Sequence, residues 1–291
     1  MPVPSVYWIA IISFNVSEQQ AVDLLLSDLA SGGPSPWRRA GEQAIERDFG
    51  PDLWRLEHFP LLAQGNVVAA AQLATLFQGR RKPPDFVVFY GCAGAVQRRD
   101  TESVFLVETV NYLSLGTVER RGGGGGEQVT LKNKWLCHTD PIADAQPLEL
   151  ARFPLCSGSG LLNLPALSGI PTARVAATDK VVRVGPSPVP MPTVPGPPHD
   201  SYAKAEWTYG EALGLVAGAG GVVLVEMESY GIGRIARALD ILDRVVVMRV
   251  TTDALTDHLV SAASQRELLK EGRKVLAHLL VSLFAPSLSS P

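Results

Sequence analysis

Cysteine is scarce in this chain of 291 residues, which contains only Cys92, Cys137 and Cys156. Three cysteines cannot all pair with one another, and their wide spacing is not that of a metal-binding cluster. A reducing compartment is the simplest interpretation. We therefore expect a cytoplasmic protein with no bound metal.

The sequence also has no long apolar run and no concentration of positive charge. No segment reaches the roughly 18 consecutive apolar residues of a membrane-spanning helix, and the first residues do not have the basic and apolar segments of a secretory signal. Lys and Arg together number 26, Asp and Glu 29, and no dense basic cluster indicates nucleic-acid binding. We expect neither a membrane nor a nucleic acid among the partners of the protein.

What the chain does contain is an alternation of strand-like and helix-like segments. Hydrophobic residues make up 46% of the sequence, enough for a sizeable core. Strands are predicted at residues 6–12, 53–62, 85–90, 104–113 (continuing towards 118), 172–182, 222–225 and 244–250, and helices at residues 17–29, 67–77, 202–217, 229–239 and 261–284. This alternation predicts one α/β domain over residues 1–291, with a largely central sheet flanked by helices.

Four segments have an unusual composition. Residues 30–51 are turn-rich and charged, without a clear period. Residues 91–95 (GCAGA) predict a small-residue turn after the strand at 85–90, where a ligand could approach the backbone. Five glycines at residues 122–126 predict a flexible hairpin tip or a disordered loop. Seven prolines in residues 183–198 predict an extended surface loop, inserted over residues 183–200; a linker between domains is the alternative.

Acidic residues follow three of the predicted strands. Glu18 lies in the first turn of a helix that we expect Ser17 to cap. Glu226 and Glu228 follow the strand at 222–225, and Asp253 follows the strand at 244–250. Each acid alone could be a turn or capping residue, but the carboxyl ends of strands in an open α/β sheet meet in one cleft. A buried carboxylate also needs a polar partner, so we expect one near these acids. The meeting of several acids in one cleft predicts a functional site.

Motifs along most of the chain resemble the nucleoside phosphorylase and nucleosidase superfamily, most closely its methylthioadenosine/S-adenosylhomocysteine nucleosidases. The most specific segment is residues 225–229 (VEMES), which is similar to the V-E-M-E-x signature of that branch. The others are the first strand with Glu18, the glycine turn and small-residue helix at 65–70, the G-x-A-G loop at 91–95 and the R-x-x-[ST]-D motif at 249–253.

The resemblance implies a single α/β domain whose central mixed sheet is partly barrel-like. It also implies an enzyme without a cofactor or metal, assembled as a dimer or hexamer. The implied reaction is hydrolysis of the N-glycosidic bond of a purine nucleoside, with water as the nucleophile. Such cleavage develops oxocarbenium character on the ribose and negative charge on the departing base.

The resemblance also implies a role for each matching residue. Asp253, with a pKa raised by an apolar pocket or nearby acids, would protonate the base. Glu18 would be the general base that activates water. Glu228 would hold the ribose hydroxyls, and Met227 would pack on the ribose face or simply belong to the core. The remaining implied substrate-binding residues are Glu226, Gly91, Ala93, Thr252 and Val181.

Hydrolysis and phosphorolysis differ in what must be bound besides the nucleoside. Phosphorylases of this superfamily place one arginine in the loop after the first strand and another two residues before the G-x-x-G loop. Here residues 13–17 contain no basic residue, and the second position is Phe89. Phosphate would lose its strongest partners, which favours hydrolysis. Arg266, thirteen residues after Asp253, keeps a phosphorylase open as the alternative.

Two further questions stay open. Residues 177–181 read ATDKV where the resembling family has S-G-D-x-F, so Val181 replaces an aromatic side chain that would stack on the base, and adenine is not assured. A catalytically weakened module that binds a nucleotide for sensing is a third hypothesis for the whole chain.

Overall fold

The computed structural model describes residues 6–31, 37–49, 52–61, 64–79, 82–112, 117–123, 126–132, 148–149, 169–177, 221–254 and 262–284. Several sequence predictions lie outside these residues. They are the helix at 202–217, the proline-rich insertion at 183–200, the end of the strand at 172–182, and Val181.

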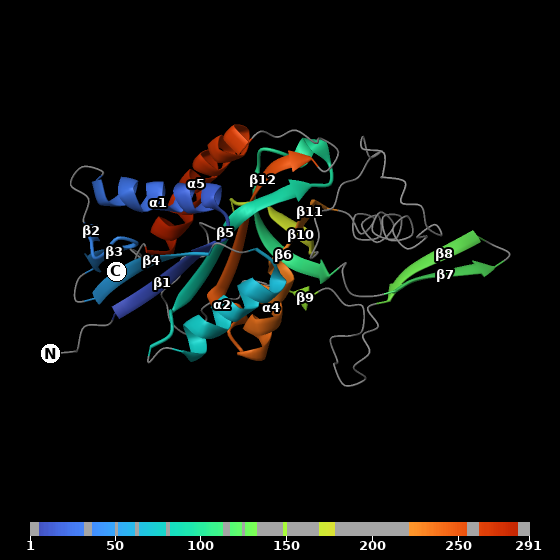
Figure 1. Ribbon diagram of the computed structural model, residues 1–291, viewed down its shortest axis with the longest axis horizontal. Helices are drawn as coiled ribbons and strands as arrows, with labels where there is room; N and C mark the ends of the chain where they lie inside the picture. Colours follow the sequence, from blue (N-terminus) through green and yellow to red (C-terminus); the bar gives the residue numbers. More distant parts are fainter. Residues whose placement is uncertain are drawn as a thin grey trace, which may run out of the picture.

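One large mixed sheet organises the chain. Its strands lie in the order β11 (Val223–Glu226), β10 (Thr172–Ala177), β6 (Val104–Tyr112), β12 (Val245–Ala254), β5 (Phe86–Ala95), β1 (Val6–Ser13), β4 (Asp52–Pro60), β3 (Ala44–Phe49) and β2 (Arg38–Arg39), with β9 (Leu148–Glu149) beside β6. A separate ribbon of β7 (Thr117–Gly123) and β8 (Gly126–Lys132) extends away from it (Figure 1). This arrangement confirms the predicted α/β class.

The first five strands of this order close into a ring. β11 pairs parallel with β10 at one edge and antiparallel with β5 at the other, through Leu224 with Ala95 and Val225 with Gly94. We call β11, β10, β6, β12 and β5 the five-strand ring. It confirms the partly barrel-like sheet that the resemblance implied, and it brings the ends of β11 and β12 to the two sides of β5.

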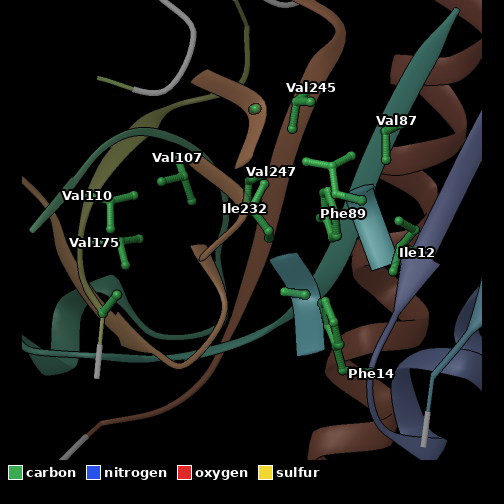
Figure 2. Close-up of a cluster of buried hydrophobic side chains, with 14 of the residues drawn as sticks. Ile12, Phe14, Val87, Phe89, Val107, Val110, Val175, Ile232, Val245 and Val247 are labelled. Atoms are coloured by element: carbon green, nitrogen blue, oxygen red, sulfur yellow. The ribbon is translucent and has the colours of Figure 1, made fainter. Parts of the chain in front are cut away.

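Four described helices cover the sheet in two pairs: α1 (Val16–Ser31) with α5 (Ala262–Phe284), and α2 (Asn66–Gln78) with α4 (Ser229–Ala238). Figure 1 shows the two pairs on opposite sides of the sheet. Each pair covers its own apolar core, and Figure 2 shows part of the core beneath α2 and α4, including Ile12, Phe14, Phe89, Val247 and Ile232. Burying each such side chain stabilises the fold by about 1.5–3 kcal/mol.

Short elements complete the description. The 3-10 turns η1 (Arg98–Asp100) and η3 (Leu242–Arg244) precede β6 and β12. None of the described helices is both long and apolar enough to cross a membrane.

The structure corrects several sequence predictions. Residues 91–95 are not a turn but the second half of β5, because β12 pairs with them on one side and β11 on the other. Tertiary pairing here overrides the low strand propensity of glycine and alanine. The turn-rich residues 30–51 contain β2 and β3, which the sequence did not indicate.

Other corrections concern boundaries. Helix α1 is capped by Asn15, whose Oδ1 accepts the Glu18 N–H at 3.0 Å, and not by Ser17, which is already helical. Strand β6 ends at Tyr112, and Val118 belongs to β7 of the separate ribbon. Gly123 ends β7 and lies opposite Gly126, which begins β8, in agreement with the hairpin interpretation of the glycine run.

Candidate active site

A buried arginine stands at the centre of the predicted acids. Arg249 lies on β12 and is fully buried, and its Nη2 is 2.6 Å from Glu226 Oε2 and 3.3 Å from Glu228 Oε2. Burial alone would lower the pKa of Arg249, but the carboxylates of Glu226, Glu228 and Glu18 together raise it above the usual value. This arginine is the polar partner that buried carboxylates at the end of β11 require.

Glu226 uses its carboxylate entirely within the protein. Besides Arg249, it accepts the N–H of Glu228 at 3.0 Å and the N–H of Ser229 at 3.0 and 2.9 Å on its two oxygens. These N–H groups begin helix α4, where a carboxylate is favourable. Glu226 therefore positions Arg249 and the start of α4.

Glu228 lies between Arg249 and the N-terminal end of helix α2. Its Oε1 accepts the N–H of Gly65 at 3.3 Å, just before helix α2, while Oε2 faces Arg249. Burial raises the pKa of Glu228 to about 8; Arg249 opposes the shift, and Glu226 and Glu18 add to it. The surroundings of Glu228 therefore favour the neutral form of its carboxyl group.

Glu18 is held by backbone donors from the segment between β1 and α1 and from strand β5. Oε2 accepts the N–H of Phe14 at 2.8 Å and of Asn15 at 3.1 Å, and Oε1 accepts the N–H of Cys92 at 2.8 Å. With the Asn15 cap of the Glu18 N–H, this is a reciprocal capping box at the start of α1. The Glu18 carboxylate therefore caps helix α1 and also lies in the candidate site.

Gly91 explains how Glu18 and Arg249 can meet. A Cβ at Gly91 would lie 2.6 Å from Arg249 Nη1 and 2.8 Å from Glu18 Oε1. The space that was expected to admit a ligand at this glycine is therefore filled by two side chains of the site. Gly91 serves the site by letting them approach the backbone of β5.

Asp253 is brought to the same region by strand register. Gly94 of β5 pairs with Val225 of β11 on one side and with Asp253 of β12 on the other. Burial raises the pKa of Asp253, and the Thr252 hydroxyl, 3.1 Å from its Oδ1, opposes the shift. Asp253 thus has the direction of pKa shift that an acid near neutral pH needs.

The other predicted residues line the same strand ends. Ala93 and Thr252 are buried on β5 and β12, and Met227 is half-buried between Glu226 and Glu228, outside both apolar cores. Burial and the neighbouring Glu18 raise the pKa of Cys92, so it is a thiol beside the site. Within the described ranges, no group of three or more His, Cys, Asp or Glu side chains could hold a metal ion.

Sequence reasoning missed two features that shape the site. The first is the role of Arg249: the R-x-x-[ST]-D motif contains this residue, and the need of buried carboxylates for a polar partner is the signal that could have identified it. The crossing of α2 and α4 was not visible: Gly231 donates its N–H to Asn66 Oδ1 at 2.8 Å, and a Cβ at Gly231 would lie 1.9 Å from the Asn66 carbonyl oxygen. This crossing sets the Gly65 N–H against Glu228.

Solved structures with a similar fold include several nucleosidases. The 5'-methylthioadenosine/S-adenosyl homocysteine nucleosidase of Helicobacter pylori is similar with a TM-score of 0.54 and 14% sequence identity, over 96% of this chain and 98% of that one. The corresponding nucleosidase of Colwellia psychrerythraea, solved with adenine, gives 0.53 and 16%, over 99% and 100%. The futalosine hydrolase of Helicobacter pylori gives 0.53 and 13%, over 95% and 97%.

No protein-family model matches the sequence, and no curated protein matches it either. At such low identity, the similarity establishes the fold. The chain has the fold of the nucleosidases in the nucleoside phosphorylase and nucleosidase superfamily, as its motifs predicted.

Proposed function

We propose that the protein is a nucleosidase that hydrolyses the N-glycosidic bond of a purine nucleoside. The observation that carries this proposal is the buried group of Glu18, Glu226 and Glu228 around Arg249, with Asp253 further along the same strand, β12. Glycosidic cleavage needs one carboxyl group that gives a proton and one that activates water. Asp253 is partly buried, which suits the proton donor. Three backbone N–H groups orient the Glu18 carboxylate, which suits the group that activates water.

Asp253 is the proposed acid. Its position is partly buried, which favours the neutral form of a carboxyl group. A protonated Asp253 would donate to the departing base as negative charge develops there. Proton donation by a positioned side chain is worth roughly 10²–10⁴-fold in rate.

Glu18 is the proposed base, and Glu228 the proposed ribose ligand. Three backbone N–H groups orient Glu18, so its carboxylate does not have to reorganise when it takes a proton from water. Glu228 would accept the ribose hydroxyls, and in its ionised form it would favour the positive charge that develops on the sugar. Met227 would cover the ribose face.

Hydrolysis is preferred to phosphorolysis because of two positions. Phe89, where a phosphorylase would carry arginine, is fully buried and stacks on Phe14 with ring centroids 5.9 Å apart. Neither ring offers phosphate a partner. One observation favours the alternative: Gln265 of α5 reaches Cys92 Sγ at 3.2 Å, so the neighbouring Arg266 is carried on a helix turn that adjoins the site.

The remaining expectations concern the setting of the enzyme. We propose a homo-oligomer, a dimer or hexamer, working in the cytoplasm on a small nucleoside without a metal or cofactor.

A turnover assay tests the proposal. The protein is incubated with methylthioadenosine, adenosine, inosine and adenosylhomocysteine, with and without phosphate, and free base and free sugar are measured. We expect base release that does not depend on phosphate and yields the free sugar. Phosphate-dependent release with a sugar phosphate as product would establish the phosphorylase instead. Tight binding without release would support a sensing module.

A further inference from the structure

Ser13, His58 and Asp23 form a hydrogen-bonded chain of side chains next to the segment that binds Glu18, the proposed general base. The proposed mechanism does not use this chain. Ser13, the last residue of β1, has its Oγ 2.8 Å from Nε2 of His58 on β4. Nδ1 of the same ring is 2.7 Å from Oδ1 of Asp23 on α1. Serine and histidine are fully buried, while the Asp23 side chain is 55% exposed.

The hydrogen-bond directions follow from the partners. A carboxylate only accepts, so His58 Nδ1 carries the hydrogen that is donated to Asp23. Burial lowers the pKa of His58, and Asp23 opposes the shift, so the ring is neutral at neutral pH. Nε2 of a neutral ring then accepts, and the Ser13 hydroxyl donates to it.

The same three residue types form the triads of hydrolases that attack through serine. That use is excluded in this conformation, because Ser13 has no exposed surface and a substrate carbonyl could not reach its hydroxyl. The hydrogen-bonded chain of Ser13, His58 and Asp23 therefore supports the structure of the protein and does not attack a substrate.

Its place in the fold indicates what it acts on. Ser13 precedes Phe14 and Asn15, whose N–H groups hold Glu18 Oε2. Strand pairing ends close to this point: the Ser13 carbonyl still accepts the Leu61 N–H at 2.9 Å, but the pairing of β1 with β5 ends one residue earlier. The hydrogen bond to His58 adds a side-chain anchor at the last residue of β1.

Asp23 adds a connection to the helix that carries Glu18. Asp23 and Glu18 both lie on α1. The hydrogen-bonded chain is therefore attached at Asp23 to that helix, and at Ser13 to the end of β1, next to the N–H groups that bind the Glu18 carboxylate. We infer that Ser13, His58 and Asp23 are positioning residues for the reaction, which fix the Phe14–Asn15 backbone against Glu18. This inference rests on the proposed function of Glu18.

Two substitutions at one position separate the halves of the chain. His58→Asn places its amide near the position of Nδ1, so it can keep the contact with Asp23 but not the contact with Ser13. His58→Gln reaches the position of Nε2 and can keep the contact with Ser13. Ser13→Ala removes the same contact from the other side with a small change in volume.

Asp85 offers a matched control at the opposite end of β1. Its Oδ2 accepts the Trp8 N–H at 2.7 Å, so Asp85→Ala also removes a side-chain anchor of this strand, but far along it from Glu18. We expect Asp85→Ala to lower the thermal midpoint and leave kcat unchanged.

The experiment measures kcat, KM and thermal midpoint for each variant on the nucleoside that the wild type turns over. Small displacements of a catalytic group cost up to about 10²-fold in rate. We expect Ser13→Ala and His58→Asn to lower kcat about tenfold or more with KM within about twofold, and His58→Gln to recover most of kcat.

Each other outcome overturns the inference. If Ser13→Ala and His58→Asn lower the thermal midpoint but keep kcat within about twofold of the wild type, the chain is structural only. If His58→Gln is as slow as His58→Asn, the Ser13 contact is not what matters. If the wild type itself releases no base from any nucleoside, the proposed function fails, and this inference fails with it.

Discussion

Arg249 Nη2 and Glu226 Oε2 lie 2.6 Å apart, and neither side chain is more than 2% exposed. The pair is central to the candidate site, since the same arginine faces Glu228 and the same glutamate accepts the N–H of Ser229, the first residue of helix α4. A charge of either sign here is tolerated only because the other is present.

Replacing Arg249 by Met is expected to leave buried carboxylates without their counter-charge. Removing one partner of a buried ion pair costs about 3–5 kcal/mol, and we expect a loss of that size in the free energy of unfolding from urea titrations. Arg55→Met is the control, because Arg55 pairs with Glu46 and Glu57 while 35% exposed. The control should lose no more than about 1 kcal/mol. Equal losses would contradict the assigned burial of Arg249.

The raised pKa of Glu228 has a consequence for stability. Its folded-state pKa of about 8 lies above the ordinary value of 4.5, so the folded protein holds this proton more tightly than the unfolded chain. The contribution of Glu228 to the free energy of unfolding should therefore fall as the pH rises from about 4.5 to about 8. Glu228→Gln cannot ionise, so the free energy of unfolding of the wild type, measured relative to this variant, should fall over the same interval. A difference that stays constant or rises would refute the assignment.

Asp253→Asn should abolish proton donation while sparing the fold, because the amide has nearly the same size. We expect kcat to fall by about 10²-fold or more, with the thermal midpoint within a few degrees of the wild type. Base release and thermal melts measured on the same preparation test this. Wild-type turnover in the variant would remove Asp253 from the mechanism.

Glu18→Gln should reduce both turnover and stability. The amide nitrogen must face a backbone N–H at one of the two oxygen positions that now accept from Phe14, Asn15 and Cys92. An unpaired buried donor costs about 1–3 kcal/mol, so a lower urea midpoint should accompany the loss of hydrolysis. Unchanged hydrolysis would show that another group activates the water.

Gly91→Ala tests the close approach above β5. Its Cβ would meet Arg249 Nη1 and Glu18 Oε1 at distances that real Cβ contacts do not adopt, so we expect lower stability and at least tenfold slower turnover. Gly169→Ala is the matched control, since no atom lies within 4 Å of its added Cβ. It should behave like the wild type within about 0.5 kcal/mol. A neutral Gly91→Ala would contradict the packing of the site.

Much of this site could be predicted from the sequence because strand ends and acids are local signals. The runs before Glu18, Glu226 and Asp253 have clear apolar patterns, and the structure places all three acids around β5. The resemblance added the order of the motifs and the barrel-like sheet.

What the sequence could not provide depends on contacts between distant segments. Residues 91–95 look like a turn in isolation and become a strand because β11 and β12 pair with them. The use of Glu226 as an internal anchor, and the hydrogen bond between Ser13 and His58, also join segments that carry no local mark of one another. Periodicity cannot reveal such pairs.

The closure of the five-strand ring governs when the site can exist during folding. β5 and β11 are far apart in the chain and are joined by only two residue pairs, so the ring must bring distant segments together for little immediate gain. A nascent chain that has not yet produced β11 and β12 carries Glu18 without Arg249 and Glu228. Assembly of the acids should therefore be a late event in folding, and loss of this short seam would dismantle the site before the rest of the sheet.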